Sequence, residues 1–304
     1  YMPTLALVNS VAFNQMKDAE KEFASIRVWG TIGWILAGLA ISFIFHWDTT
    51  EAIGQGLLKN TFLLAGIAAL ILGIFSFILS QTPPKVSDEK VKITDILGLD
   101  ALQLLKDKNF LIFFISSILI CIPLAFYYQN THPYLKASCV KNPIRKMSIG
   151  QISEALFLLL IPVFFGRYGF KKTILVGMLA WAIRYVLFAY GNGSDLSFML
   201  IIGIALHGIC YDFFFVSGQI YTNSKAGEKY KSAAQGLITL ATYGIGMLIG
   251  FAVAGWITDN YKTVDGGTNW QMVWIIPAGI AFAVFLIFAL FFDQKKEVKT
   301  TVTL

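Results

Sequence analysis

Long hydrophobic runs alternate with short polar segments along nearly the whole chain, and many runs reach the roughly 20 residues that cross a bilayer core. The pattern predicts an all-α membrane protein with a partial helix at residues 1–14 and eight full spans. The full spans are predicted at residues 26–46, 60–80, 109–134, 147–166, 173–190, 196–221, 232–258 and 270–292. Because the sequence starts with Tyr1 inside a helical pattern, we interpret it as an N-terminally truncated fragment.

The longest polar connection, residues 81–108, divides the predicted spans into two groups. Its second part is weakly amphipathic and predicts a short helix at the membrane interface. Sixteen of the 24 lysines and arginines fall in the connections on one side, against six on the other. Cytoplasmic connections carry such an excess, so we expect residues 81–108 and the tail 293–304 to be cytoplasmic.

Composition narrows the functional classes. Of the 304 residues 56% are hydrophobic and 14% are charged, against about 25% charged in soluble domains, so no sizeable soluble domain is expected. The net charge of +6 follows from the basic connections and does not indicate nucleic-acid binding. The three cysteines and three histidines show no metal-ligand spacing, and we expect no metal, no cofactor and no obligate protein partner.

Two carboxylates lie inside predicted spans, where an ionised group costs about 3 kcal/mol. Glu154 is one helical turn from Gln151 and on the same face. It is interpreted either as an interfacial carboxylate that reaches headgroup water or as a proton or ligand site facing a cavity. Asp212 lies near the middle of its span, where a structural ion pair competes with a titratable functional carboxylate.

Two arginines also lie within spans. Arg27 and Thr31 share one helix face, and Arg27 could either line a cavity or extend its side chain to the cytoplasmic interface. Arg184 is favoured as a structural residue on a peripheral helix, paired with a carboxylate or a carbonyl.

Polar and aromatic residues cluster at the outer end of the span 109–134. The cluster could form an aromatic belt at the interface, or a platform on which a base stacks while amides read its edge. Its members are Tyr127, Tyr128, Gln129, Asn130 and His132. His207 could titrate near neutral pH or make a hydrogen-bonded packing contact.

The connection GRYGFKK at residues 166–172 resembles the weaker C-terminal copy of the loop motif of the major facilitator superfamily. Longer strings resemble the nucleoside:proton symporter family within that superfamily, closer to its less characterised nucleoside transporters than to its well-studied permeases. These strings are YMPTLALVNS, IRVWGTIGW, LGLDALQLLKDKNF, GQISEALF, HGICYDFFF and SAAQGL.

The resemblance implies the transporter fold of that superfamily, with about nine of its twelve helices present. Residues 1–80 would then be part of the N-terminal half (the end of helix 4, with helices 5 and 6), and residues 109–292 the complete C-terminal half, helices 7–12. The implied protein is a multi-pass carrier of the bacterial inner membrane that moves a nucleoside inward with a proton by alternating access.

The resemblance also implies roles for single residues. Glu154 and Asp212 would couple transport to protons. The substrate site would comprise these two carboxylates together with Arg27, Thr31, Tyr127, Tyr128, Gln129, Gln151, His207 and Tyr211.

The sequence departs from the studied permeases at three positions. Ala125 and Tyr128 stand where those permeases have Gln and Asn, and His207 stands where they have Tyr. A carrier for a sugar or another small polar metabolite therefore remains an alternative. A membrane-embedded enzyme and a non-transporting sensor are remote ones.

Overall fold

The computed structural model describes residues 2–47, 49–79, 81–82, 98–140 and 143–293. The chain divides into two compact units, Tyr1–Val28 with Val91–Leu304, and Trp29–Lys90. One boundary falls inside helix α2 (Ala19–Leu39), between Val28 and Trp29. Regular structure in the described residues is helical, apart from one isolated bridge between Lys262 and Thr268.

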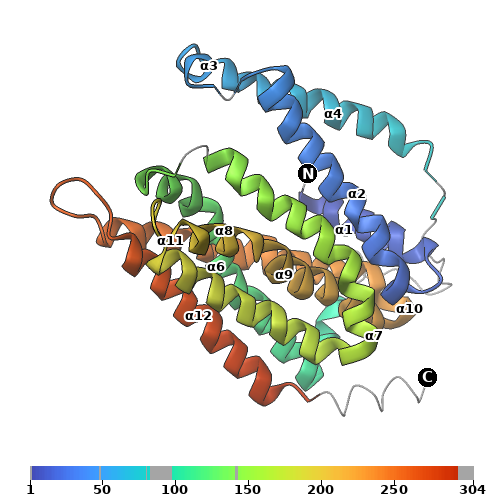
Figure 1. Ribbon diagram of the computed structural model, residues 1–304. Coiled ribbons are helices and arrows are strands. Elements are labelled where there is room, and N and C mark those ends of the chain that lie inside the picture. Colours follow the sequence, from blue (N-terminus) through green and yellow to red (C-terminus); the bar gives the residue numbers. More distant parts are fainter. Residues whose placement is uncertain (1, 48, 80, 83–97, 141–142, 294–304) are drawn as a thin grey trace. The chain divides into compact units, whose positions relative to one another are not determined.

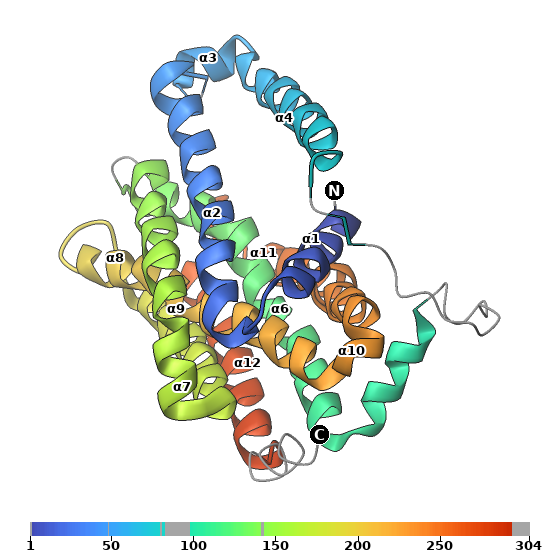
Figure 2. The same cartoon turned by 90° about the vertical axis from the view of Figure 1, so that its right-hand side faces the viewer.

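The larger unit contains most of the helices (Figure 1). They are α1 (Met2–Gln15), the start of α2, the 3-10 helix η3 (Leu99–Lys106), α6 (Lys108–Ala137), α7 (Pro143–Tyr190), α8 (Ser197–Ala205), α9 (His207–Tyr211), the π-helix η4 (Asp212–Val216), α10 (Ser217–Thr239), the π-helix η5 (Leu240–Gly246), α11 (Met247–Asn260) and α12 (Trp270–Phe291). Helix α12 packs against α6 and α7, and α11 packs against α6 (Figure 2).

Two of these helices are interrupted by glycine. Gly169 has φ 73° inside α7, and Gly227 has φ 59° inside α10. Such backbone is readily adopted only by glycine, so α7 and α10 each consist of two helices joined at that residue. The predicted spans 147–166 and 173–190 correspond to the two parts of α7.

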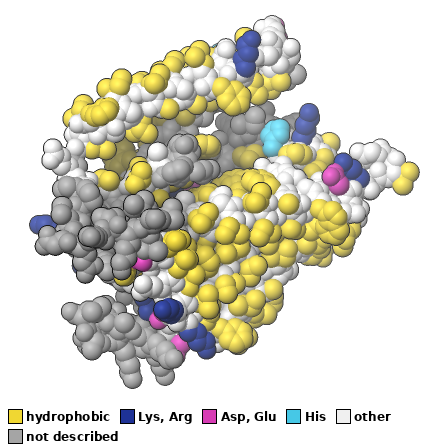
Figure 3. Space-filling model, turned by 180° about the vertical axis from the view of Figure 1, so that it is seen from behind, with side chains coloured by type: hydrophobic (Ala, Val, Ile, Leu, Met, Phe, Trp, Pro, Cys, Tyr) yellow, Lys and Arg dark blue, Asp and Glu magenta, His cyan; other side chains and the backbone are white. Residues whose placement is uncertain are grey.

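Seven stretches of the described residues are long and apolar enough to cross a membrane, and one of them contains both parts of α7. Together they match the eight predicted spans. Hydrophobic side chains cover much of the face shown in Figure 3, with lysine and arginine side chains at its edges. Such a surface suits contact with lipid.

The smaller unit contains the rest of α2, the π-helix η1 (Ala40–Ile44), α3 (Thr50–Gly54), the 3-10 helix η2 (Leu57–Lys59) and α4 (Asn60–Ser76). Helix α4 matches the predicted span 60–80. Large apolar side chains along it, such as Phe62 and Leu70, are exposed.

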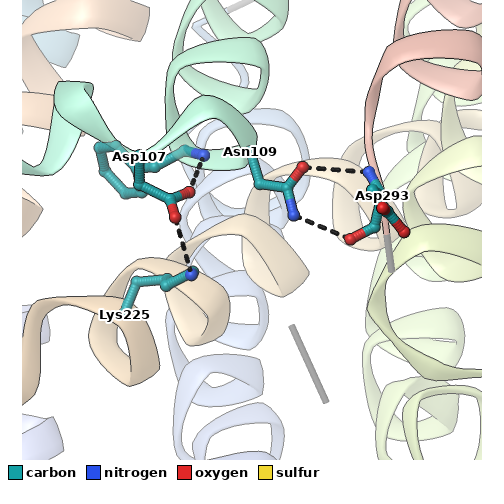
Figure 4. Close-up of polar contacts among 5 residues, drawn as sticks. Asp107, Asn109, Lys225 and Asp293 are labelled. Carbon is teal, nitrogen blue, oxygen red and sulfur yellow. Dashed lines mark hydrogen bonds and ion pairs between the residues drawn. The ribbon is translucent and has the colours of Figure 1, made fainter. Parts of the chain in front are cut away.

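Polar contacts join the start of α6 to two distant segments (Figure 4). The Asp107 carboxylate accepts a hydrogen bond from the Phe110 backbone N–H at 2.8 Å and lies 3.5 Å from the Lys225 ammonium. Asn109 donates to the Asp293 carbonyl at 2.8 Å and accepts from the Asp293 N–H at 3.0 Å. These contacts hold α6, α10 and the end of α12 together.

Within the connection 81–108, the 3-10 helix η3 replaces the predicted interfacial helix over Leu99–Lys106. The first residues of that predicted helix, 93–97, lie outside the described residues.

Candidate functional site

The first part of α7 and the segment α8–α9–η4 approach each other very closely at Gly208. A Cβ atom on Gly208 would lie 2.4 Å from the Ser153 carbonyl oxygen and 2.7 Å from the Glu154 backbone nitrogen. Only glycine permits this approach without movement of the backbone. The crossing therefore sets Glu154 against His207, the residue before the glycine.

The helix that carries His207 and Asp212 is irregular. Helix α8 ends at Ala205, whose carbonyl accepts a hydrogen bond from the Ser153 hydroxyl. Helix α9 comprises only five residues, His207–Tyr211, and the π-helical segment η4 begins at Asp212. Such π segments occur frequently at functional sites. The sequence predicted one uninterrupted helix over residues 196–221, because the hydrophobic pattern carries no signal for these changes.

Arg184, on the second part of α7, contacts His207 and is fully buried. Its Nη1 lies 3.0 Å from His207 Nδ1, and the other ring nitrogen, Nε2, lies 3.8 Å from Glu154 Oε2. The guanidinium also lies 3.6 Å from the centre of the Tyr127 ring. The arginine thus joins a row of side chains that ends at a predicted site carboxylate.

These contacts differ from what we expected of Arg184. Its described partners are the His207 imidazole, the Cys210 thiol and nearby aromatic rings, above all that of Tyr127, in place of the predicted carboxylate or carbonyl. A desolvated cation–π contact contributes about 2 kcal/mol or more, which offsets part of the cost of burying the charge. Sequence reasoning missed the link to the site, because only the folded structure brings α7 and α9 together.

Tyr127 also stacks on His207, the middle residue of this row. Its ring centre lies 5.0 Å from that of His207, with 23° between the planes. The tyrosine is buried, which excludes the aromatic-belt interpretation for this residue.

Asp212 is fully buried, and neither of its carboxylate oxygens has a hydrogen-bond partner among the described residues. Glu154 and Arg27 lie within electrostatic range of it. The structure therefore brings the two predicted proton-linked carboxylates and one predicted cation into a common neighbourhood.

Tyr211 lies beside the same group. Its hydroxyl is hydrogen-bonded to that of Tyr243, and its ring centre is 5.7 Å from that of His207. Tyr243 belongs to the second π-helical segment of the larger unit, η5. The sequence analysis missed Tyr243, and nothing in its neighbourhood in the sequence distinguishes it from other tyrosines within spans.

Two other members of the predicted aromatic cluster point to different places: Tyr128 toward the site and Asn130 toward α11. Tyr128 is 48% exposed and lies within electrostatic range of Tyr211 and Glu154. Asn130 instead donates a hydrogen bond at 3.0 Å to the Thr258 hydroxyl on α11. Tyr128 and Asn130 therefore do not belong to one platform.

Three other predicted residues are placed less fully. The Gln129 amide nitrogen would be 3.7 Å from a Cβ on Gly255, so this side chain lies against α11. Gln151 is partly exposed, one turn before Glu154. Thr31 belongs to the smaller unit, and its role in the site stays a prediction.

Among the described residues, no group of three or more His, Cys, Asp or Glu side chains could hold a metal ion. Ionisable and polar side chains gathered between α7, α9 and η4 can, by their own chemistry, exchange protons and bind a polar ligand. A model of the nucleoside H+ symporter family matches residues 1–297. The chain belongs to this family.

Individual members of the nucleoside H+ symporter family match over nearly the whole chain. YegT of Escherichia coli (strain K12) is 42% identical, and the match covers 99% of this chain and 72% of YegT. The nucleoside permease NupG of the same organism is 33% identical, with 97% of this chain and 72% of NupG covered.

A solved structure agrees with these matches. The crystal structure of NupG with the D323A mutation has a TM-score of 0.72 at 32% identity and covers 96% of this chain and 74% of that chain. The fold is therefore the transporter fold of the major facilitator superfamily. This symporter is a multi-pass protein of the inner membrane, and the predictions of family, fold and location are confirmed.

Proposed function

We propose that this symporter takes up nucleosides together with protons, and that Glu154 and Asp212 are its proton-linked groups. The observation that carries the proposal is Asp212, a fully buried carboxylate without a hydrogen-bond partner among the described residues. Burying an unpaired charge is costly, so a carboxylate in this position is suited to take up and release a proton. We further propose that the protein acts as a carrier and not as an enzyme.

Protonation of Glu154 or Asp212 would change the electrostatic interaction of that residue with the other carboxylate and with Arg27. Glu154, Asp212 and Arg27 lie within electrostatic range of one another. Among these three groups, two negative charges meet one positive charge when both carboxylates are ionised. Adding a proton removes one of the two negative charges, and we propose that this favours the conformational change by which the loaded site opens to the other side of the membrane.

The substrate side of the proposal rests on the same neighbourhood. Tyr128 has an exposed aromatic face near Tyr211, on which a nucleobase can stack. Gln151, with both an amide donor and an acceptor, can read the edge of the base. Arg27, on the part of α2 that belongs to the larger unit, is proposed to contact the same ligand.

We also propose that residues 109–292 form one complete six-helix half of the carrier. Six helices support this proposal: α6, the two parts of α7, the segment from α8 to the first part of α10, the segment from there to α11, and α12. Glu154, His207 and Asp212 all belong to this half.

Uptake into proteoliposomes tests the proposal, using the protein made from its complete coding sequence. We expect radiolabelled nucleoside to accumulate when the outside is acidic, and a protonophore to abolish the accumulation. Competition by a panel of nucleosides and sugars identifies the cargo. Uptake that ignores the pH gradient would refute proton coupling, and competition by sugars alone would refute the nucleoside assignment.

A further inference from the structure

The row Arg184–His207–Glu154 fixes where the ring proton of His207 lies. A guanidinium has hydrogen-bond donors and no acceptor. At 3.0 Å from Arg184 Nη1, His207 Nδ1 must therefore accept, and it needs a free lone pair to do so. A neutral imidazole carries one proton, which is then on Nε2, the nitrogen that faces Glu154 at 3.8 Å.

The surroundings of the ring favour the same state. Arg184 faces it from the second part of α7, Glu154 from the first part, and Tyr127 from α6. Tyr211 and Asp212 follow on its own segment. Stacking on Tyr127 fixes the plane of the ring. A 180° turn of the ring would keep that plane but would place carbons where the two nitrogens meet Arg184 and Glu154, so the polar contacts favour the described orientation.

The arginine depends on this contact as well. Its Nε and Nη2 atoms have no hydrogen-bond partner among the described residues. If His207 took up a second proton, Nδ1 would become a donor and two cations would face each other across 3.0 Å. Protonation of the histidine would therefore remove this hydrogen bond from a buried cation.

We propose that Arg184 is a positioning residue that holds His207 neutral, with its ring proton on Nε2 and directed at Glu154. His207 is then a fixed hydrogen-bond donor of the transport site and not a carrier of the transported proton. At 3.8 Å the contact with Glu154 is longer than a hydrogen bond, so an acceptor group of the substrate can also receive this N–H. The proposal rests on the proposed role of Glu154 in transport, but its test requires no transport.

Nitrogen NMR of the complete protein, labelled with ¹⁵N-histidine in lipid nanodiscs, tests the proposal directly. The described chain has three histidines, His46, His132 and His207, and the spectrum of His207→Gln assigns the signals of His207 by their disappearance. We expect Nδ1 of His207 to be unprotonated and Nε2 to be protonated throughout the range of about pH 5 to 8, in which free histidine titrates. A protonated Nδ1, or a second proton acquired within this range, would overturn the proposal.

A pair of variants separates positioning from a general effect of charge. Arg184→Met keeps a long apolar side chain among the aromatic rings but removes the donor, and we expect His207 to lose its single tautomer and to titrate. Lys262→Gln removes an exposed cation that pairs with Asp259, and it should leave the signals of His207 unchanged.

The spectra of the two variants are compared with that of the unaltered protein to decide whether Arg184 fixes the tautomer of His207. A fixed Nε2–H tautomer in Arg184→Met would overturn the role of the arginine. If that variant does not fold, the spectrum of the unaltered protein still decides the tautomer. Uptake without any dependence on Glu154 would refute the proposed function and leave the tautomer result standing.

Discussion

Replacing Gly208 by alanine tests whether the close crossing of α9 and α7 is needed for the site. The added Cβ would lie 2.5 Å from the Ser153 carbonyl carbon and 2.7 Å from the Glu154 nitrogen. Non-bonded carbons normally stay about 3.5–4.0 Å apart. The two helices must therefore separate by roughly 1 Å, which lengthens the 3.8 Å contact between His207 and Glu154 to roughly 5 Å.

The magnitude follows from two opposing terms. Overpacking of this kind costs about 1–3 kcal/mol, while glycine to alanine inside a helix gains about 0.5–1 kcal/mol. Gly279→Ala on α12 is the matched control, because its Cβ would meet nothing within 4 Å. The gain is common to both variants, so their difference in unfolding free energy should be the overpacking cost, about 1–3 kcal/mol.

The assay is thermal unfolding of both variants in the same detergent, together with nucleoside uptake. We expect Gly208→Ala to unfold several degrees below Gly279→Ala and to take up nucleoside more weakly, with Gly279→Ala close to the parent protein. If about 1.4 kcal/mol of the cost falls on substrate binding, affinity drops about tenfold. Equal stability and equal uptake in the two variants would refute the argument that this crossing positions Glu154.

Two further substitutions test contacts outside the proposed site. Lys171 donates hydrogen bonds to the Ala289 and Phe292 carbonyls at the end of α12, at 2.8 and 2.6 Å. We expect Lys171→Met to lower the unfolding free energy by about 1–2 kcal/mol. The control is Lys172→Met, and equal melting temperatures of the two variants would contradict this prediction. Asn130→Ala should cost about 1 kcal/mol through its lost partner on α11 and leave the KM for nucleoside unchanged, whereas a large rise in KM would place Asn130 in the substrate site.

The sequence predicted the spans well because a bilayer requires about 20 consecutive apolar residues. It also singled out Glu154 and Asp212 as candidate site residues, since a carboxylate inside such a run is costly and therefore conspicuous. Even the break at Gly169 could be anticipated from the polar connection around it.

The arrangement of the side chains could not be predicted in the same way. Arg184 and His207 are 23 residues apart and meet because the second part of α7 packs on α9. Two π-helical segments, η4 from Asp212 and η5 around Tyr243, shift the register of the side chains that follow. The hydrophobic pattern of the sequence does not reveal either segment. Asn130 is next to the aromatic cluster in the sequence, but its place on the helix turns its side chain toward α11, where it donates a hydrogen bond to Thr258.

The central claim is that protonation of Asp212 sets the affinity for nucleoside. Thermodynamic coupling requires that a proton bound with the substrate strengthens substrate binding, and the reverse. The most direct measurement is nucleoside affinity between about pH 5 and 8, for the complete protein and for Asp212→Asn, whose side chain resembles the protonated acid. We predict that affinity rises as pH falls in the parent protein and changes much less in the variant. The same pH dependence in both would contradict the account.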